Sequence, residues 1–130
     1  MRFLSLTLTL ALLASVANAK PPLRDVAEID DALMKIAIAN EIRNRCDGIE
    51  ARMLRALSEI GSLRARARAL GYTRAEIRAY TDSREEEARL RSKASNWLLG
   101  QGVTLASNEQ LCAFGKKQMK TGSEIGKLLR

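Results

Sequence analysis

From Leu23 to Arg130 the chain contains no proline, and this absence constrains its fold more than any other feature. Proline interrupts helix interiors, so a long stretch without it leaves extended helices unobstructed. The same stretch is dominated by Ala, Leu, Arg, Glu and Lys, which are favourable in helices. We therefore expect an all-α fold, a small bundle of four to five helices.

Apolar periodicity and capping patterns predict where these helices lie. A helix over residues 26–46 has apolar side chains on nearly all sides, which is typical of a central helix. A second helix, expected over 49–70, carries a stripe of apolar residues at heptad-like spacing, a seam that Leu54 and Leu57 make wider. Between them, Asp47-Gly48 is either a tight turn or a kink. A third helical region spans 74–99 with an interruption at 81–83, a fourth helix spans 107–120, and Ile125, Leu128 and Leu129 dock the tail.

Five positions have Ser, Thr or Asp followed three residues later by Glu or Gln, the pattern of a helix N-terminal capping box. Thr73 has the strongest support, because Gly71 can end the preceding helix and Tyr72 with Ile77 forms a hydrophobic staple. The five pairs are Asp25–Glu28, Asp47–Glu50, Thr73–Glu76, Ser83–Glu86 and Ser107–Gln110.

The first nineteen residues have the pattern of a secretory signal peptide. Arg2 is followed by an apolar segment that ends at Val16, and Ala17-Asn18-Ala19 supplies small residues for cleavage. The apolar segment is shorter than the roughly 20 residues that a membrane span needs. We therefore expect a cleaved leader at 1–19, a single helical domain at 20–130 without a transmembrane span, and a periplasmic or secreted location.

Export has a consequence for the two cysteines, Cys46 and Cys112. Both lie in the expected mature chain and have no C-x-x-C spacing. Paired cysteines in an oxidising compartment normally form a structural disulfide, so we expect a Cys46–Cys112 bridge.

Composition argues against several classes of function. The chain has no His, which removes the commonest general base and metal ligand, and two Cys cannot complete a four-ligand zinc site. Nucleotide-binding glycine loops and nucleophile elbows are also missing from the sequence. We expect no metal and no cofactor, and the residues name no specific activity.

The chain resembles a numbered domain-of-unknown-function family of small exported proteins from alphaproteobacteria. The resemblance covers essentially the whole expected mature chain. It implies export and a helical fold, and it names no site. The residues that carry it are Lys20-Pro21-Pro22-Leu23, Ile42-Arg43, Cys46, Ala51-Arg52, Leu70-Gly71-Tyr72, Glu76-Ile77, Leu111-Cys112, Gly122-Ser123-Glu124-Ile125-Gly126 and Leu128-Leu129.

The basic balance is the first functional candidate. Lys and Arg number 22 against 15 Asp and Glu, a formal net charge of +7. Arg43, Arg45, Arg52 and Arg55 cluster around Cys46 and are candidates for contact with an anionic surface or an unidentified envelope protein. The alternative is that these arginines are only a solvated face. We expect a binding or structural role in the bacterial envelope.

Two alternatives come from other classes of function. Residues 70–78 resemble the turn and second helix of a helix-turn-helix, so a protein that is not exported could bind nucleic acid. The leader argues against nucleic acid as a partner. So does the small number of aromatic residues, four in the expected mature chain, because they offer little surface for stacking on bases. A carboxylate-dependent enzyme would need two carboxylates that face each other, with Asp30, Asp31, Glu41 and Asp47 as candidates.

Overall fold

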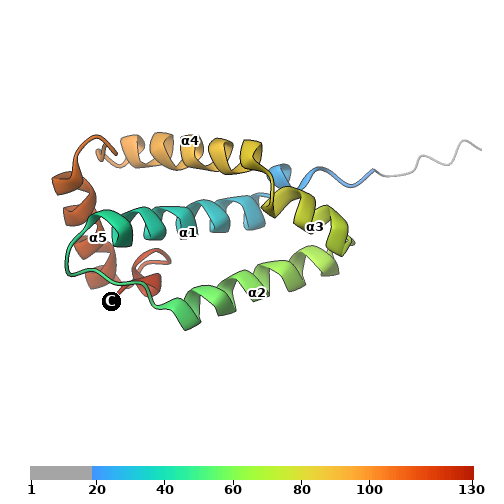
Figure 1. Ribbon diagram of the computed structural model, residues 1–130, viewed down its shortest axis with the longest axis horizontal. Helices are drawn as coiled ribbons and strands as arrows, with labels where there is room; N and C mark the ends of the chain where they lie inside the picture. Colours follow the sequence, from blue (N-terminus) through green and yellow to red (C-terminus); the bar gives the residue numbers. More distant parts are fainter. Residues whose placement is uncertain (1–18) are drawn as a thin grey trace, which may run out of the picture.

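The computed structural model describes residues 19–130, and every regular element in that range is helical (Figure 1). The predicted all-α fold is thereby confirmed. The expected leader lies outside the described residues up to Asn18, including Ala17, whereas Ala19 is described and exposed. The elements are η1 (Leu23–Asp25), α1 (Ala27–Arg45), α2 (Met53–Ala69), α3 (Arg74–Thr81), α4 (Arg84–Gly100), α5 (Asn108–Thr121) and η2 (Gly126–Leu128).

Helix α1 is central, as its all-round apolar character predicts. It lies between α4 and α2, with α3 near one end and α5 near the other (Figure 1). Ile38 and Ile42 are fully buried because neighbouring helices cover α1 on more than one side.

The main core joins α1, α4, α5 and the tail. Leu98, Leu111 and Leu129 are almost fully buried in it, and Trp97 of α4 packs edge-on against Phe114 of α5 with ring centroids 6.1 Å apart. The predicted docking of the tail is confirmed by the burial of Ile125, Leu128 and Leu129, and η2 lies against α5.

A disulfide joins Cys46, directly after α1, to Cys112 in α5, with the two Cα atoms 5.4 Å apart. The bond confirms the pairing that the sequence predicts. It holds the carboxyl end of α1 and the start of the following link against α5.

A second, smaller core lies at the other end of the molecule, where η1 and α1 meet α2 and α3. Tyr72 and Ile77 are buried there with Leu23 and Ala67. The capping box at Thr73 is confirmed: its hydroxyl accepts the Glu76 N–H at 3.1 Å, and the Glu76 carboxylate accepts the Thr73 N–H at 2.6 Å.

Two further capping predictions hold and two are wrong. Ser83 and Ser107 accept the backbone N–H three residues on, at the starts of α4 and α5. Asp25 and Asp47 cap no α-helix. Asp25 lies within η1, and α1 begins directly after Val26. Asp47 lies in a turn, and the next helix begins only at Met53.

The second helix begins at Met53, four residues later than predicted. Gly48 adopts a positive φ of 78°, so Asp47-Gly48 is a turn between separate helices. Ile49 is then buried in the main core, and the Glu50 and Arg52 N–H groups donate to the carbonyls of Arg130 and Leu128. These hydrogen bonds to the tail keep residues 49–52 out of the helix, whereas the apolar periodicity of the sequence predicts a helix through them.

Candidate functional site

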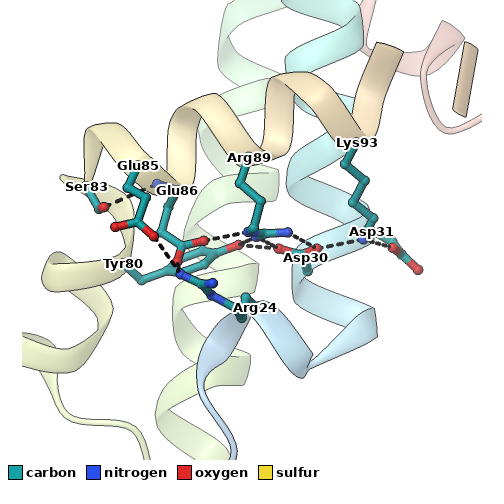
Figure 2. Close-up of polar contacts among 9 residues, drawn as sticks. All are labelled: Arg24, Asp30, Asp31, Tyr80, Ser83, Glu85, Glu86, Arg89 and Lys93. Carbon is teal, nitrogen blue, oxygen red and sulfur yellow. Dashed lines mark hydrogen bonds and ion pairs between the residues drawn. The ribbon is translucent and has the colours of Figure 1, made fainter. Parts of the chain in front are cut away.

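The most deeply buried charge among residues 19–130 is Asp30, near the start of α1, whose side chain is 1% exposed. Figure 2 shows that side chains from α3 and α4 converge on its carboxylate. Lys93 Nζ lies 2.6 Å from Oδ2, the Tyr80 hydroxyl donates to Oδ1 at 2.5 Å, and Arg89 pairs with both oxygens. The carboxylate therefore ties α1 to both α3 and α4.

The cluster continues toward the amino-terminal segment through Glu86 (Figure 2). Arg89 Nε donates to Glu86 at 2.7 Å, and Arg24 of η1 pairs with the same carboxylate. Lys93 also reaches Asp31 at 2.5 Å. Every buried side-chain nitrogen or oxygen of the described residues has a hydrogen-bond partner.

These contacts set the protonation states within the cluster. Burial alone would raise the pKa of Asp30, but hydrogen bonds from Arg89, Lys93 and Tyr80 outweigh it and lower the pKa from 3.8 to about 2. The pKa of Tyr80 is raised, first by burial and then by its hydrogen bond to Asp30. Asp30 is thus ionised and fully paired at neutral pH, as in a structural cluster.

The carboxylates considered for catalysis do not form an acid–base pair around a cleft. Asp30 and Asp31 are held by cations, Glu41 lies 3.9 Å from Arg45, and Asp47 is exposed. General acid–base catalysis works best when the pKa lies near the working pH, and the pKa of Asp30 is far below it.

The four arginines predicted to contact an anionic partner do not share one free surface. Arg45 donates to Asn108 and to the Leu105 carbonyl, and Arg52 Nε donates to the Leu129 carbonyl at 2.9 Å. Arg43 is exposed and bonds Asn40 within α1, and Arg55 lines a separate depression with Glu59. Two of the four therefore hold neighbouring segments together, and anion contact by the set stays a prediction.

A different group of arginines does converge. Arg64 and Arg68 of α2 and Arg74 and Arg78 of α3 line one groove of about 570 Å³ between these helices. All four are exposed, and within residues 19–130 none of their guanidinium groups forms an ion pair or a side-chain hydrogen bond. Asp82 is the single acidic residue of the lining. The groove is therefore an open site with an excess of positive charge.

The sequence contains a pattern for each cluster, a pair of basic residues four positions apart on one helix, but each pattern gives only the part of the site that lies on that helix. Arg64 with Arg68, and Arg74 with Arg78, are four residues apart and share a helix face, and the Gly71 turn brings the two pairs together. Arg89 and Lys93 have the same spacing on α4 and meet Asp30. Spacing within a helix can be read from the sequence, whereas the meeting of two helices cannot.

Within residues 19–130, no helix combines the length and apolarity required to cross a membrane. That range also holds no group of three or more His, Cys, Asp or Glu side chains placed to bind a metal ion.

The chain matches the Family of unknown function (DUF5333) over residues 21–130, from the segment before η1 to the last residue. No curated protein and no solved structure matches it. The helical domain with the Asp30 cluster and the α2–α3 groove thus coincides with the matched range, and the chain belongs to this family of unknown function.

Proposed function

We propose that this protein is exported and acts in the bacterial envelope by binding a phosphate-bearing anionic partner in the α2–α3 arginine groove. The proposal concerns binding, and no reaction is assigned. The observation that carries it is the convergence of Arg64, Arg68, Arg74 and Arg78, without acidic partners among the described residues, on one groove.

Two observations support export. The leader pattern ends at Ala19, and the family match begins at Pro21, so the matched range starts just beyond the expected cleavage point. The Cys46–Cys112 disulfide is of the kind that persists in oxidising compartments.

Arginine chemistry favours phosphate as the ligand group. The guanidinium is always charged, and its planar fork matches phosphate oxygens in a bidentate geometry. The formal net charge of +7 adds long-range attraction for an anionic surface. An arginine without an internal partner keeps its donors for an external one, which distinguishes this groove from the surroundings of Arg45 and Arg52.

The test is binding to phosphatidylglycerol vesicles, with phosphatidylcholine vesicles as the neutral reference. The full chain, expressed with its leader, is compared with R64Q/R68Q and with R43Q/R55Q, which removes the same charge outside the groove. We expect R64Q/R68Q to weaken binding roughly 30-fold, since each basic residue near an anionic surface contributes about 1 kcal/mol. R43Q/R55Q should change it less than about threefold, because neither residue lines the groove.

Two results would overturn the proposal. An equal loss in both double variants would show that net charge alone governs binding. Preferential binding to duplex DNA at physiological salt, lost in R64Q/R68Q, would assign the groove to nucleic acid, the alternative suggested by residues 70–78.

A further inference from the structure

Helix α2 has a wider apolar sector than the fold covers. Ala67 is its single buried residue, and Ala56, Ile60 and Leu63 are half-buried toward the body of the protein. In the amino-terminal half of α2, Leu54 is 86% exposed, Leu57 59% and Met53 53%. Scattered exposed leucines are ordinary, but three large apolar side chains on adjacent turns form a patch that water solvates poorly.

The patch and the groove arginines share one strip of the helix. Residues four, seven and eleven positions apart face nearly the same direction, which aligns Leu57 with Gly61, Arg64 and Arg68. At 1.5 Å per residue, Leu57 and Arg64 lie about 10 Å apart along the axis. One outward strip is therefore apolar at its start and basic at its end.

The surroundings of the patch are also apolar. Beside it, a depression of about 340 Å³ between α1 and α2 has a mainly apolar lining, with Asn40 and Arg43 as its polar residues. The residues of α2 carry four arginines and one acid, Glu59. Glu59 lies two positions after Leu57 and thus points to the opposite side of the helix. No acidic residue of α2 opposes an anion that approaches the strip.

We propose that α2 docks on the surface of an anionic phospholipid leaflet, with Leu54, Leu57 and Met53 entering the outer acyl region and Arg64 and Arg68 holding lipid phosphates. The inference rests on the proposed function and makes its ligand the headgroup of a lipid within a membrane. Charge complementarity selects this occupant. Phosphates lie directly above acyl chains in a leaflet, and α2 presents arginines next to uncovered leucines. Interfacial helices bury such faces about 5–10 Å deep and keep arginines at the headgroups.

The experiment separates apolar insertion from charge attraction by salt. The full chain is bound to phosphatidylglycerol vesicles at low salt and then washed at about 1 M salt, where charge interactions at the surface are largely screened. We expect the wild-type protein to stay bound. L54Q/L57Q, which keeps good helix formers in place, should be released with roughly 30-fold weaker residual binding.

Leu99 provides a matched control. It is 56% exposed, close to the value for Leu57, and lies at the end of α4, with α1 between α4 and α2 (Figure 1). L99Q should bind like the wild type. Quenching of tryptophan fluorescence by brominated acyl chains gives a direct readout of insertion. The quenching should be strong in L57W. In L99W it should not exceed that of the wild type, whose own Trp97 is partly buried.

Each outcome decides between the two proposals. If R64Q/R68Q loses binding, while L54Q/L57Q matches the wild type both in binding and in its response to the salt wash, insertion is wrong and the groove proposal stands. If the wild type does not bind anionic vesicles, both are wrong. A wild-type dimer that L54Q/L57Q converts to monomer, or a soluble one-to-one complex with extracted lipid, would give the patch a different occupant and overturn the inference.

Discussion

The two ends of α1 are fastened by unlike means. At the carboxyl end, a covalent bond joins Cys46 to α5 next to the main apolar core. At the amino end, Asp30 is held by Arg89, Lys93 and Tyr80. The first attachment requires two residues and an oxidising environment, whereas the second requires several side chains from three helices in one geometry. The two ends should therefore respond to different stresses, one to reductant and the other to acid.

The largest effect is expected at the covalent end. The bridge closes a loop of 66 residues, so C46S/C112S should lower the free energy of unfolding by about 4 kcal/mol in the loop-closure description. Urea unfolding followed by circular dichroism measures it. Reductant should weaken the wild type by a similar amount and leave the double variant unchanged; a stable reduced protein would contradict this.

At the polar end, D30N should lower the free energy of unfolding by about 3 kcal/mol, because it removes the carboxylate that compensates two cations. The loss is limited because Arg89 still pairs with Glu86 and Lys93 still pairs with Asp31. The matched control is D31N, which removes one half-exposed pair and should cost under about 1 kcal/mol. Equal losses in the two variants would show that burial of Asp30 does not matter.

Acid should weaken only the polar end. The pKa of Asp30 is about 2 in the folded protein against 3.8 for an unperturbed aspartate, so the folded state binds fewer protons between these pH values. The stabilisation by the Asp30 carboxylate is present above about pH 4 and is lost as the pH falls through 2. The free energy of unfolding should therefore fall more steeply in the wild type than in D30N below pH 4. Parallel pH curves would assign the acid response to other carboxylates.

The smallest expected effect is the coupling between the ends. Asp30 lies sixteen residues before Cys46, the residue directly after α1, which is about 24 Å along the helix axis, and Asp30 is not part of the core cluster that contains Cys46. Combining D30N with C46S/C112S should therefore give the sum of the separate losses within about 0.5 kcal/mol. A coupling above 1 kcal/mol would mean that α1 transmits strain between its ends, and urea unfolding of the variants measures it.

The positions of most helices could be predicted, because the signals are local. Thr73, Ser83 and Ser107 are found at helix starts since their side chains satisfy backbone N–H groups within three residues. The start of α2 could not, because the link at 49–52 is held by residues 128–130, far along the chain. Leu54 and Leu57 widen the predicted seam, yet periodicity does not tell which part of an apolar face a neighbour will cover.

The sequence by itself determined the helical class and the pairing of the two cysteines, because helix propensity is local and two cysteines allow one intramolecular bond. Only the tertiary structure decided that Asp30 is buried among cations, that Arg45 and Arg52 hold backbone carbonyls, and that Arg64, Arg68, Arg74 and Arg78 share a groove. The physical reason is that the partner of a charged side chain depends on how helices cross, and that crossing is set by the packing of the whole core.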